Sequence, residues 1–231
     1  MMKRLFFMRQ KWISLSLIVG VWGFFHWSHP WDWVSLITAC FWLWIHRRNH
    51  LVWRDTSRST GEILLSPIDG RLVKIGEFQD PETGAQFTEL RIQTAYYHNW
   101  GLYLPSSAEM DFLRQTEGSR FTRAEFPTLS WDKIEKTTRT EVVLKSTSGH
   151  STRLCFPLSL NNKAPHIWMK SGDRGRGAAC FGYYPFGGSL IVFVPKASDV
   201  LVVPNERITA GRTVLAVFRP LNENTEDSYG L

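Results

Sequence analysis

A serine that follows a glycine can attack the peptide bond between them, and Gly188-Ser189 is a step in this sequence that suits such chemistry. The serine hydroxyl can attack the glycine carbonyl, because glycine has no Cβ and tolerates a strained backbone. The peptide becomes an ester, and elimination of that ester then breaks the chain. Serine is a weak nucleophile at its ordinary pKa and needs a positioned base. Asp69 and His98 are the candidates, because a carboxylate can orient an imidazole that takes the proton.

Each of these residues also has an ordinary structural role open to it. Ser189 stands where a strand is expected to begin, and a serine there need have no chemical role. Asp69 precedes Gly70, and this pair favours a tight turn whatever its function. His98 fits equally well as an exposed or hydrogen-bonded histidine. The Phe-Gly-Gly that precedes the serine favours the functional interpretation.

The elements that would position these residues are short strands. From residue 62 onward, runs rich in β-branched and aromatic residues alternate with turn residues, and helical periodicity is almost absent. This pattern predicts a mainly β fold, a twisted β-sandwich or barrel-like domain. The expected strands are Glu62–Leu65, Arg71–Ile75, Thr88–Thr94, Trp100–Leu104, Glu141–Ser146, Arg153–Pro157, Ser189–Pro195, Val200–Val203 and Thr213–Phe218.

Some stretches of the domain are less regular. Ala108–Glu117 is predicted to be a helix or an irregular crossing segment, and residues 114–140 are predicted to form a long surface excursion. Ser66–Gly76 and Asn205–Ala216 share a cadence of turn, glycine and strand that resembles lipoyl-like folds, and Lys170–Arg174 begins a third copy. Simple tight turns, in which glycine supplies a positive φ, would account for any one copy.

Two hydrophobic runs, at about 12–28 and 31–46, precede the domain. Tryptophans lie near their ends, and basic residues flank the pair but are absent from the connecting turn, which places both ends on the cytoplasmic side. We therefore expect a transmembrane helical hairpin as a membrane anchor (1–48), a β domain (49–221) and a disordered tail (222–231). The expected location is the inner cell membrane, with the soluble domain on its cytoplasmic side.

A cleavable signal peptide and a re-entrant hairpin are the alternatives to a spanning anchor. A signal peptide predicts one apolar region and a small-residue cleavage site, whereas here a second run and arginines follow. Each run is shorter than the roughly 20 residues that a perpendicular helix needs to cross the hydrocarbon core. A re-entrant hairpin that enters the bilayer without spanning it therefore stays open.

Composition narrows the classes of partner. The 231 residues carry a net charge of +6, which suits an anionic membrane surface as well as nucleic acid. Basic residues flank the membrane boundary and the chain shows no aromatic and basic stripe, so no nucleic-acid partner is expected. Cys40, Cys155 and Cys180 form no CxxC pair, which argues against a disulfide scaffold and a zinc site, and no metal is expected.

Several motifs together resemble the phosphatidylserine decarboxylase family, from about Arg54 to Phe218. Phe181–Val192 is similar to the self-processing segment of that family, in which an FGGS or similar step opens a strand. The remaining motifs that match, in chain order, are Arg54-Asp55 after the anchor, the SPxDG turn Ser66–Gly70, Tyr97-His98 ahead of Pro105, and the closing strand within Asn205–Ala216.

The resemblance implies a function and a cofactor. Gly188 would end a β chain, and Ser189 would become the pyruvoyl group that caps a smaller α chain. Asp69 and His98 would serve the cleavage. The pyruvoyl ketone would take up the amine of phosphatidylserine and act as electron sink while carbon dioxide leaves, giving phosphatidylethanolamine. The implied partners are the phospholipid substrate, the membrane and the chain's own two fragments, and a homodimer stays open.

The sequence also departs from the family pattern. Leu190 stands where the family usually has threonine, and Gly101 stands where many members have a second histidine. An ungapped alignment with the compact bacterial and archaeal branch places Gly188 at the serine and Trp100 at the histidine. The alternative function is therefore a non-processing, membrane-anchored homologue that binds lipid head groups or a partner protein. A lipoyl-like carrier would need a lysine at a hairpin tip, which the paired cadences lack.

Overall fold

The computed structural model describes residues 62–81, 83–96 and 98–219. The predicted hydrophobic helices at about 12–28 and 31–46 and the predicted tail at 222–231 lie outside the described residues. Within the described ranges, no helix combines the length and the apolar character needed to cross a membrane. The anchor therefore stays a prediction from the sequence.

The β domain is built on one large antiparallel sheet. Its eight strands are ordered β13-β2-β3-β11-β7-β6-β5-β9, so β11 lies between β3 and β7. In chain order they are β2 (Gly70–Gln79), β3 (Gln86–Thr94), β5 (Ala108–Thr116), β6 (Arg139–Ser146), β7 (Ser151–Pro157), β9 (Arg174–Gly175), β11 (Gly188–Pro195) and β13 (Arg207–Ile208).

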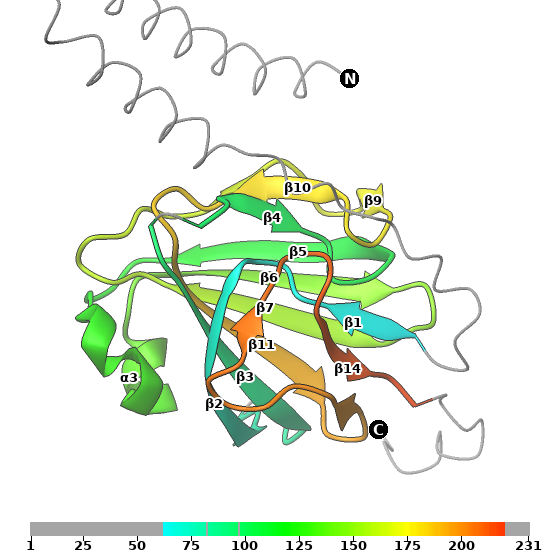
Figure 1. Cartoon of the computed structure of the whole chain (residues 1–231), viewed down its shortest axis with the longest axis horizontal. Coiled ribbons are helices and arrows are strands. Elements are labelled where there is room, and N and C mark those ends of the chain that lie inside the picture. Colours follow the sequence, from blue (N-terminus) through cyan, green and yellow to red (C-terminus); the bar gives the residue numbers. More distant parts are fainter. Residues whose placement is uncertain (1–61, 82, 97, 220–231) are drawn as a thin grey trace, which may run out of the picture. The chain divides into compact units, whose positions relative to one another are not determined.

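Two three-stranded sheets pack on one face of the large sheet (Figure 1). One is β1 (Ile63–Leu65), β14 (Val214–Val217) and β12 (Asp199–Val200), and the other is β4 (Gly101–Tyr103), β10 (Cys180–Tyr183) and β8 (His166–Ile167). The core between these layers joins Leu72 and Val192 of the large sheet to Leu102 and Leu215 of the small ones. This arrangement agrees with the predicted mainly β, sandwich-like fold, and each predicted strand overlaps an observed one.

The opposite face of the large sheet is covered by the segment that follows β5. A 3-10 helix, η3 (Arg123–Thr128), and a short helix, α3 (Trp131–Glu135), bury Phe126 and Ile134 against Phe193 and Ile191 of β11. Alternate residues of β11 thus face opposite cores, as the period of a strand requires. The predicted surface excursion at 114–140 is wrong in this respect, because its middle covers a sheet face and its two ends are strands.

The prediction of a helix or irregular segment at Ala108–Glu117 is also wrong. These residues form β5, which pairs with β6 over its full length and only with the two-residue β9 on its other side. Asp111 to Gln115 are exposed, and the register shifts between Met110 and Phe112. An exposed, bulged strand lacks the alternation of apolar and polar residues by which strands are found in a sequence.

The two related cadences at Ser66–Gly76 and Asn205–Ala216 pack against each other. Strand β13 pairs with β2, and β1 pairs with β14. Between these ladders, the Ser66 amide donates to the Thr213 carbonyl at 2.9 Å, and the Gly211 amide donates to the Ser66 carbonyl at 2.7 Å. The turn before β2 is therefore fixed by the last part of the described chain.

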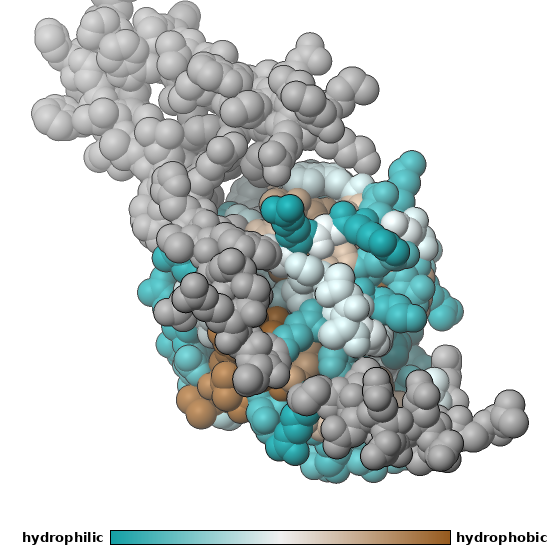
Figure 2. All heavy atoms as spheres, turned by 90° about the vertical axis from the view of Figure 1, so that its right-hand side faces the viewer, coloured by the Kyte–Doolittle hydropathy of each residue, from teal (hydrophilic) through white to brown (hydrophobic). Residues whose placement is uncertain are grey.

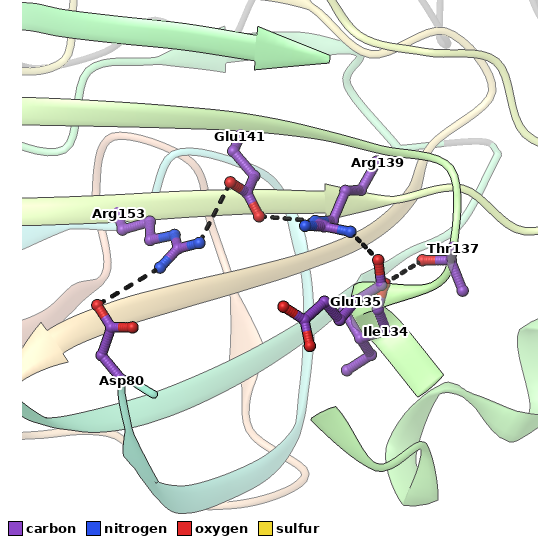
Figure 3. Close-up of polar contacts among 7 residues, drawn as sticks. All are labelled: Asp80, Ile134, Glu135, Thr137, Arg139, Glu141 and Arg153. Atoms are coloured by element: carbon purple, nitrogen blue, oxygen red, sulfur yellow. Dashed lines mark hydrogen bonds and ion pairs between the residues drawn. The ribbon is translucent and has the colours of Figure 1, made fainter. Parts of the chain in front are cut away.

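A chain of charges centred on the buried Glu141 holds α3 to the sheet. Glu141 of β6 accepts from Arg139 at 2.7 Å and lies 3.2 Å from Arg153, whose other nitrogen is 4.0 Å from Asp80 (Figure 3). Arg139 also donates to the Glu135 carbonyl at the end of α3. One buried carboxylate thus neutralises two guanidinium groups and ties the covering segment to the sheet.

The surface of the domain is mostly hydrophilic but exposes several large hydrophobic side chains. Figure 2 shows a face on which hydrophilic residues cover most of the described surface and hydrophobic ones gather toward the lower left. The large hydrophobic side chains that are exposed are Tyr96, Phe112, Leu113, Leu160, Phe186, Leu201 and Val203. They belong to separate parts of the chain and differ in the charges around them.

We predict that Glu141→Ala destabilises the fold by about 3–5 kcal/mol, because it leaves the buried Arg139 guanidinium without its carboxylate and leaves the partly buried Arg153 with Asp80 alone. Glu109→Ala is the matched control on the neighbouring strand, since its ion pair with Arg174 is exposed and is worth about 1 kcal/mol or less. Urea unfolding of the two variants measures the difference. Equal losses would contradict the structural role assigned to Glu141.

Candidate functional site

Three neighbouring strands bring the predicted site residues to one end of the large sheet. Gly188, the first residue of β11, pairs with Thr94, the last residue of β3. The Thr94 hydroxyl donates to the Asp69 carbonyl at 2.6 Å, immediately before β2 begins. Toward the left of Figure 1, the end of β3 and the start of β11 come together with the end of β10. Residues distant in sequence are therefore neighbours here because of strand register.

His98 lies in the loop that follows β3. Its backbone amide donates to the Ala95 carbonyl at 3.1 Å, which folds the loop back on the strand end. Burial lowers the pKa of His98 below its ordinary value of 6.5, and the nearby charge of Arg207 acts in the same direction. The Asp69 carboxylate and a hydrogen bond to the Asp69 backbone oppose that shift of the pKa. The imidazole is therefore mainly neutral at pH 7, which is the form that can take a proton.

The carboxylate of Asp69 is held in place by the segment Asn205–Ala216. Its Oδ1 accepts a hydrogen bond from the Ala210 amide at 2.7 Å. Arg207 lies on β13, which pairs with β2 directly after Asp69. The pair Asp69 and His98, predicted from the sequence, is thus brought together, and residues on both sides of the Gly188-Ser189 step position it.

Ser189 is fully buried, and its hydroxyl makes no hydrogen bond within the described residues. It pairs with Gln93 across the ladder, so both side chains lie on the sheet face that η3 covers. Gln93 Nε2 donates to the Arg123 carbonyl at 2.9 Å, and Arg123 Nη2 donates to the Thr94 carbonyl at 2.5 Å. The structure therefore places the hydroxyl at the same sheet end as the Asp69 and His98 pair, without a hydrogen bond to either.

Gly188 is enclosed on its other side by two buried polar side chains. A Cβ at this position would collide with the Tyr184 hydroxyl and would lie 2.6 Å from Asn162 Nδ2. The Tyr184 hydroxyl is 3.5 Å from the Ser189 carbonyl, and burial raises the Tyr184 pKa, so the phenol stays protonated. Sequence motifs did not identify Tyr184 or Asn162, because their role depends on packing that no motif records.

The backbone just before the step is strained. Phe186 and Gly187 both have positive φ angles, 63° and 68°. A glycine adopts this conformation easily, whereas a phenylalanine with positive φ is a genuine outlier that costs on the order of 1–3 kcal/mol. The Gly187 amide donates to the Tyr184 carbonyl at 3.3 Å and closes the turn. The chain thus enters β11 through a left-handed turn that delivers Gly188 against Tyr184.

In the part of the chain that the structure describes, no three histidine, cysteine or acidic side chains lie close enough to hold a metal ion.

Comparison with known proteins identifies the family. A family model for phosphatidylserine decarboxylase matches residues 50–216. Among curated proteins, the phosphatidylserine decarboxylase proenzyme of Symbiobacterium thermophilum is 26% identical over 220 residues, covering 93% of this chain and 96% of that protein. The proenzyme of Syntrophus aciditrophicus is 23% identical over 217 residues, covering 92% and 88% of the two chains.

The fold and site define a β-domain protein with a buried Gly-Ser step at a sheet end. Because the family model covers most of the chain, the chain belongs to the phosphatidylserine decarboxylase family, which is a family of carboxy-lyases. The predicted resemblance is confirmed at this level. The roles predicted for Ser189, Asp69 and His98 stay predictions.

The enclosure of Gly188 gives a test that needs no catalytic activity. In a Ser189→Ala chain, we expect a further Gly188→Ala change to destabilise the fold by about 1–3 kcal/mol, because the new methyl group overpacks against Tyr184 and Asn162. Gly76→Ala in the same background is the control, since its Cβ would meet only a flexible lysine carbon at 3.5 Å. Thermal unfolding compares the two, and an equal effect would show that Gly188 is not enclosed.

Proposed function

We propose that this chain decarboxylates phosphatidylserine to phosphatidylethanolamine, using a pyruvoyl group that it makes by cleaving itself between Gly188 and Ser189. The observation that carries the proposal is the fully buried Ser189 at a Gly-Ser step that directly follows a strained turn, at the same sheet end as a neutral imidazole. Membership of the family supports the reaction, and the geometry of the strand ends supports the residues.

The proposed cleavage begins with attack of Ser189 Oγ on the carbonyl carbon of Gly188. The base takes the Oγ proton and returns a proton to the Ser189 nitrogen as the C–N bond breaks, which leaves an ester. Removal of the Ser189 Cα proton then expels Gly188 as a carboxylate and leaves a carbon–carbon double bond. Rearrangement and hydrolysis of this enamine release ammonia and leave a ketone, so atoms and electrons balance.

His98 is the proposed base and Asp69 its positioning residue. The lowered pKa of His98 keeps the imidazole neutral, and Asp69 faces it from a turn fixed by Ala210. Apo hydrogen bonds in catalytic sites are often long or unformed, so the unpaired Ser189 hydroxyl is compatible with a small shift toward the base. The strain at Phe186 favours a movement that relaxes the turn.

The residues at this site fit a pyruvoyl group derived from Ser189. Its precursor hydroxyl is an orphaned buried atom, and the neighbouring Gly188 Cα leaves space only for hydrogen. Such a group supplies a carbonyl that takes up the substrate amine and accepts the electron pair left when carbon dioxide departs. Asp69 and His98 would hold and move protons at the same sheet end.

The membrane setting is part of the proposal. The hydrophobic runs at about 12–28 and 31–46 would form the helical hairpin, with the domain on the cytoplasmic side of the inner membrane. A phospholipid substrate stays in its bilayer, so an anchored enzyme searches a surface instead of a volume.

A second candidate function is a non-processing homologue that binds lipid head groups or a partner protein. One observation favours it: the Ser189 hydroxyl has no hydrogen bond to a base in the described residues. Trp100 and Gly101, which occupy positions where relatives of this type are expected to carry histidine, point in the same direction. The two proposals predict different states of the Gly188–Ser189 bond, cut in the first and intact in the second, so an experiment that detects the cut distinguishes them.

Self-cleavage predicts two chains on a denaturing gel of the purified protein. The smaller one should begin at position 189 with a blocked N-terminus, and mass spectrometry should find a ketone in place of the serine amine. Ser189→Ala should leave one uncut band and no release of carbon dioxide from carboxyl-labelled phosphatidylserine. Ser151→Ala, at an exposed position of β7, should cleave like the parent chain. A single intact parent band would establish the non-processing alternative.

Loss of the proposed base should slow cleavage of a freshly made precursor by about 10²-fold or more. We expect this loss of rate for His98→Gln. Asp69→Asn should have a smaller effect, because it removes the negative charge but keeps an oxygen that can accept the Ala210 hydrogen bond. His150→Gln and Asp132→Asn are the controls outside the site. Gel time courses of cell-free precursor give the rates, and wild-type rates for both site variants would remove the pair from the mechanism.

The cleavage rate should also depend on pH through His98. A base acts only when unprotonated, and burial lowers the His98 pKa, so the rate should be constant near pH 7 and fall only below pH 6.5. Time courses in buffers across this range test the sign. A rate that falls already above pH 6.5 would mean that another group takes the proton.

A further inference from the structure

Four side chains form an apolar border around the sheet end that carries the Gly-Ser step. We call them the apolar rim: Tyr96, Trp100, Leu160 and Phe186. Tyr96, Leu160 and Phe186 are 60%, 58% and 47% exposed, and Trp100 is half-buried. Large hydrophobic side chains at such exposure are unfavourable in water, so their gathering at one place requires a cause.

Contacts join three members of the apolar rim, Tyr96, Trp100 and Phe186, and Lys163 links them to the turn that carries Leu160. The rings of Trp100 and Phe186 are 5.0 Å apart, and Trp100 Nε1 donates to the Tyr96 carbonyl at 2.9 Å. Leu160 belongs to the turn after β7, whose Lys163 ammonium lies 5.8 Å from the Phe186 ring centroid. The loops after β3, after β7 and before β11 thus present one continuous edge.

The charge that these loops contribute is positive. The loops at 95–100, 158–165 and 184–187 contain no aspartate or glutamate, and they contain Lys163. Arg120 adds a further cation, because its Nη1 donates to the Leu160 carbonyl at 3.5 Å. Exposed aromatic rings with cations beside them are typical of surfaces that enter the interface of an anionic bilayer.

Two strongly exposed apolar side chains elsewhere have different neighbours. Leu201 is 58% exposed, the same fraction as Leu160, and Val203 is 62% exposed. The Val203 amide donates to the Glu206 carboxylate at 3.1 Å, and Asp199 begins the strand that precedes Leu201. Asp199 is paired with Arg219 at 2.6 Å, so charges of both signs lie near these side chains, whereas the charges named beside the apolar rim are cations. Exposure alone therefore does not single out the apolar rim, but exposure together with charge does.

We propose that the apolar rim is a bilayer-docking surface of the β domain, and that its partner is an anionic phospholipid membrane. The aromatic rings and Leu160 would lie at the level of the head groups, with Lys163 and Arg120 facing lipid phosphates. This contact is made by loops of the folded domain and is separate from the predicted N-terminal hairpin.

Docking through the apolar rim would place the Gly-Ser step next to the lipid head groups. That this brings enzyme and substrate together rests on the proposed function. Phe186 is two residues before Gly188, and Tyr96 is two residues after Thr94, the cross-strand partner of Gly188. Asn162, in the same turn as Leu160, packs on the Gly188 Cα. A head group beneath the apolar rim would therefore meet the Gly-Ser step without leaving the membrane.

The test uses the full chain in vesicles and a fluorescent label at one engineered cysteine. Cys40 and Cys180 are changed to serine, and the buried Cys155 is left in place because it is shielded from the reagent. An environment-sensitive dye is attached at Leu160→Cys or, as the matched control, at Leu201→Cys. Vesicles contain phosphatidylcholine with phosphatidylglycerol, or phosphatidylcholine alone, with brominated acyl chains as quencher.

We expect quenching at position 160 to exceed that at position 201 several-fold, and to be stronger in vesicles with phosphatidylglycerol. Equal quenching at the two positions would overturn the proposal. A label at 160 that is shielded from aqueous iodide but not quenched by brominated lipid would also overturn it, because a second copy of the chain would then cover the apolar rim.

The same measurement in a Ser189→Ala chain separates this inference from the proposed function. Preferential quenching at 160 in this uncleavable chain would support docking whether or not the parent chain cleaves itself, and a parent chain that stays intact would overturn only the decarboxylase proposal. Cleavage and carbon dioxide release without that quenching would leave the decarboxylase proposal standing and overturn docking. Neither vesicle contains phosphatidylserine, so occupancy by substrate does not enter the result.

Discussion

The register between β3 and β11 is the constraint on which the site depends. It places Gly188 opposite Thr94 and Ser189 opposite Gln93, and Thr94 in turn holds the turn that carries Asp69. A slip of one residue would exchange the two faces of β11 and turn Ser189 toward the opposite core. The register is secured because Leu190 and Val192 fit one apolar cluster while Ile191 and Phe193 fit the other.

Burial on both faces of β11 has consequences for the segment between β5 and β6. The covering layer of η3 and α3 is too short to be stable alone, and it is held by Phe126, Ile134 and the charges around Glu141. Through Arg123 the same layer also reaches Thr94 at the site. Core packing, buried ion pairs and the geometry of the Gly-Ser step are therefore parts of one arrangement.

Much of this architecture could be predicted from the sequence where local pattern and tertiary environment agree. Strands such as β3 and β11 were found because they are apolar runs bounded by turn residues. Motifs singled out Asp69, His98 and Gly188, which lie at one end of the large sheet. The strand at Ala108–Thr116 was missed because its exposed middle lacks alternation. Tyr184, Asn162 and Gln93 were missed because only packing across the sheet brings them to the step.

The position of β11 within the large sheet determines whether the two fragments would stay together after cleavage before Ser189. β11 is hydrogen-bonded on both sides, and β13 and β14 from the same C-terminal part pair with β2 and β1. Strands of the two products would be hydrogen-bonded to each other in the same sheets, so the products would stay associated without a covalent link. Scission would then be a late event in the life of the chain, because the geometry that permits it exists only once both halves have folded together.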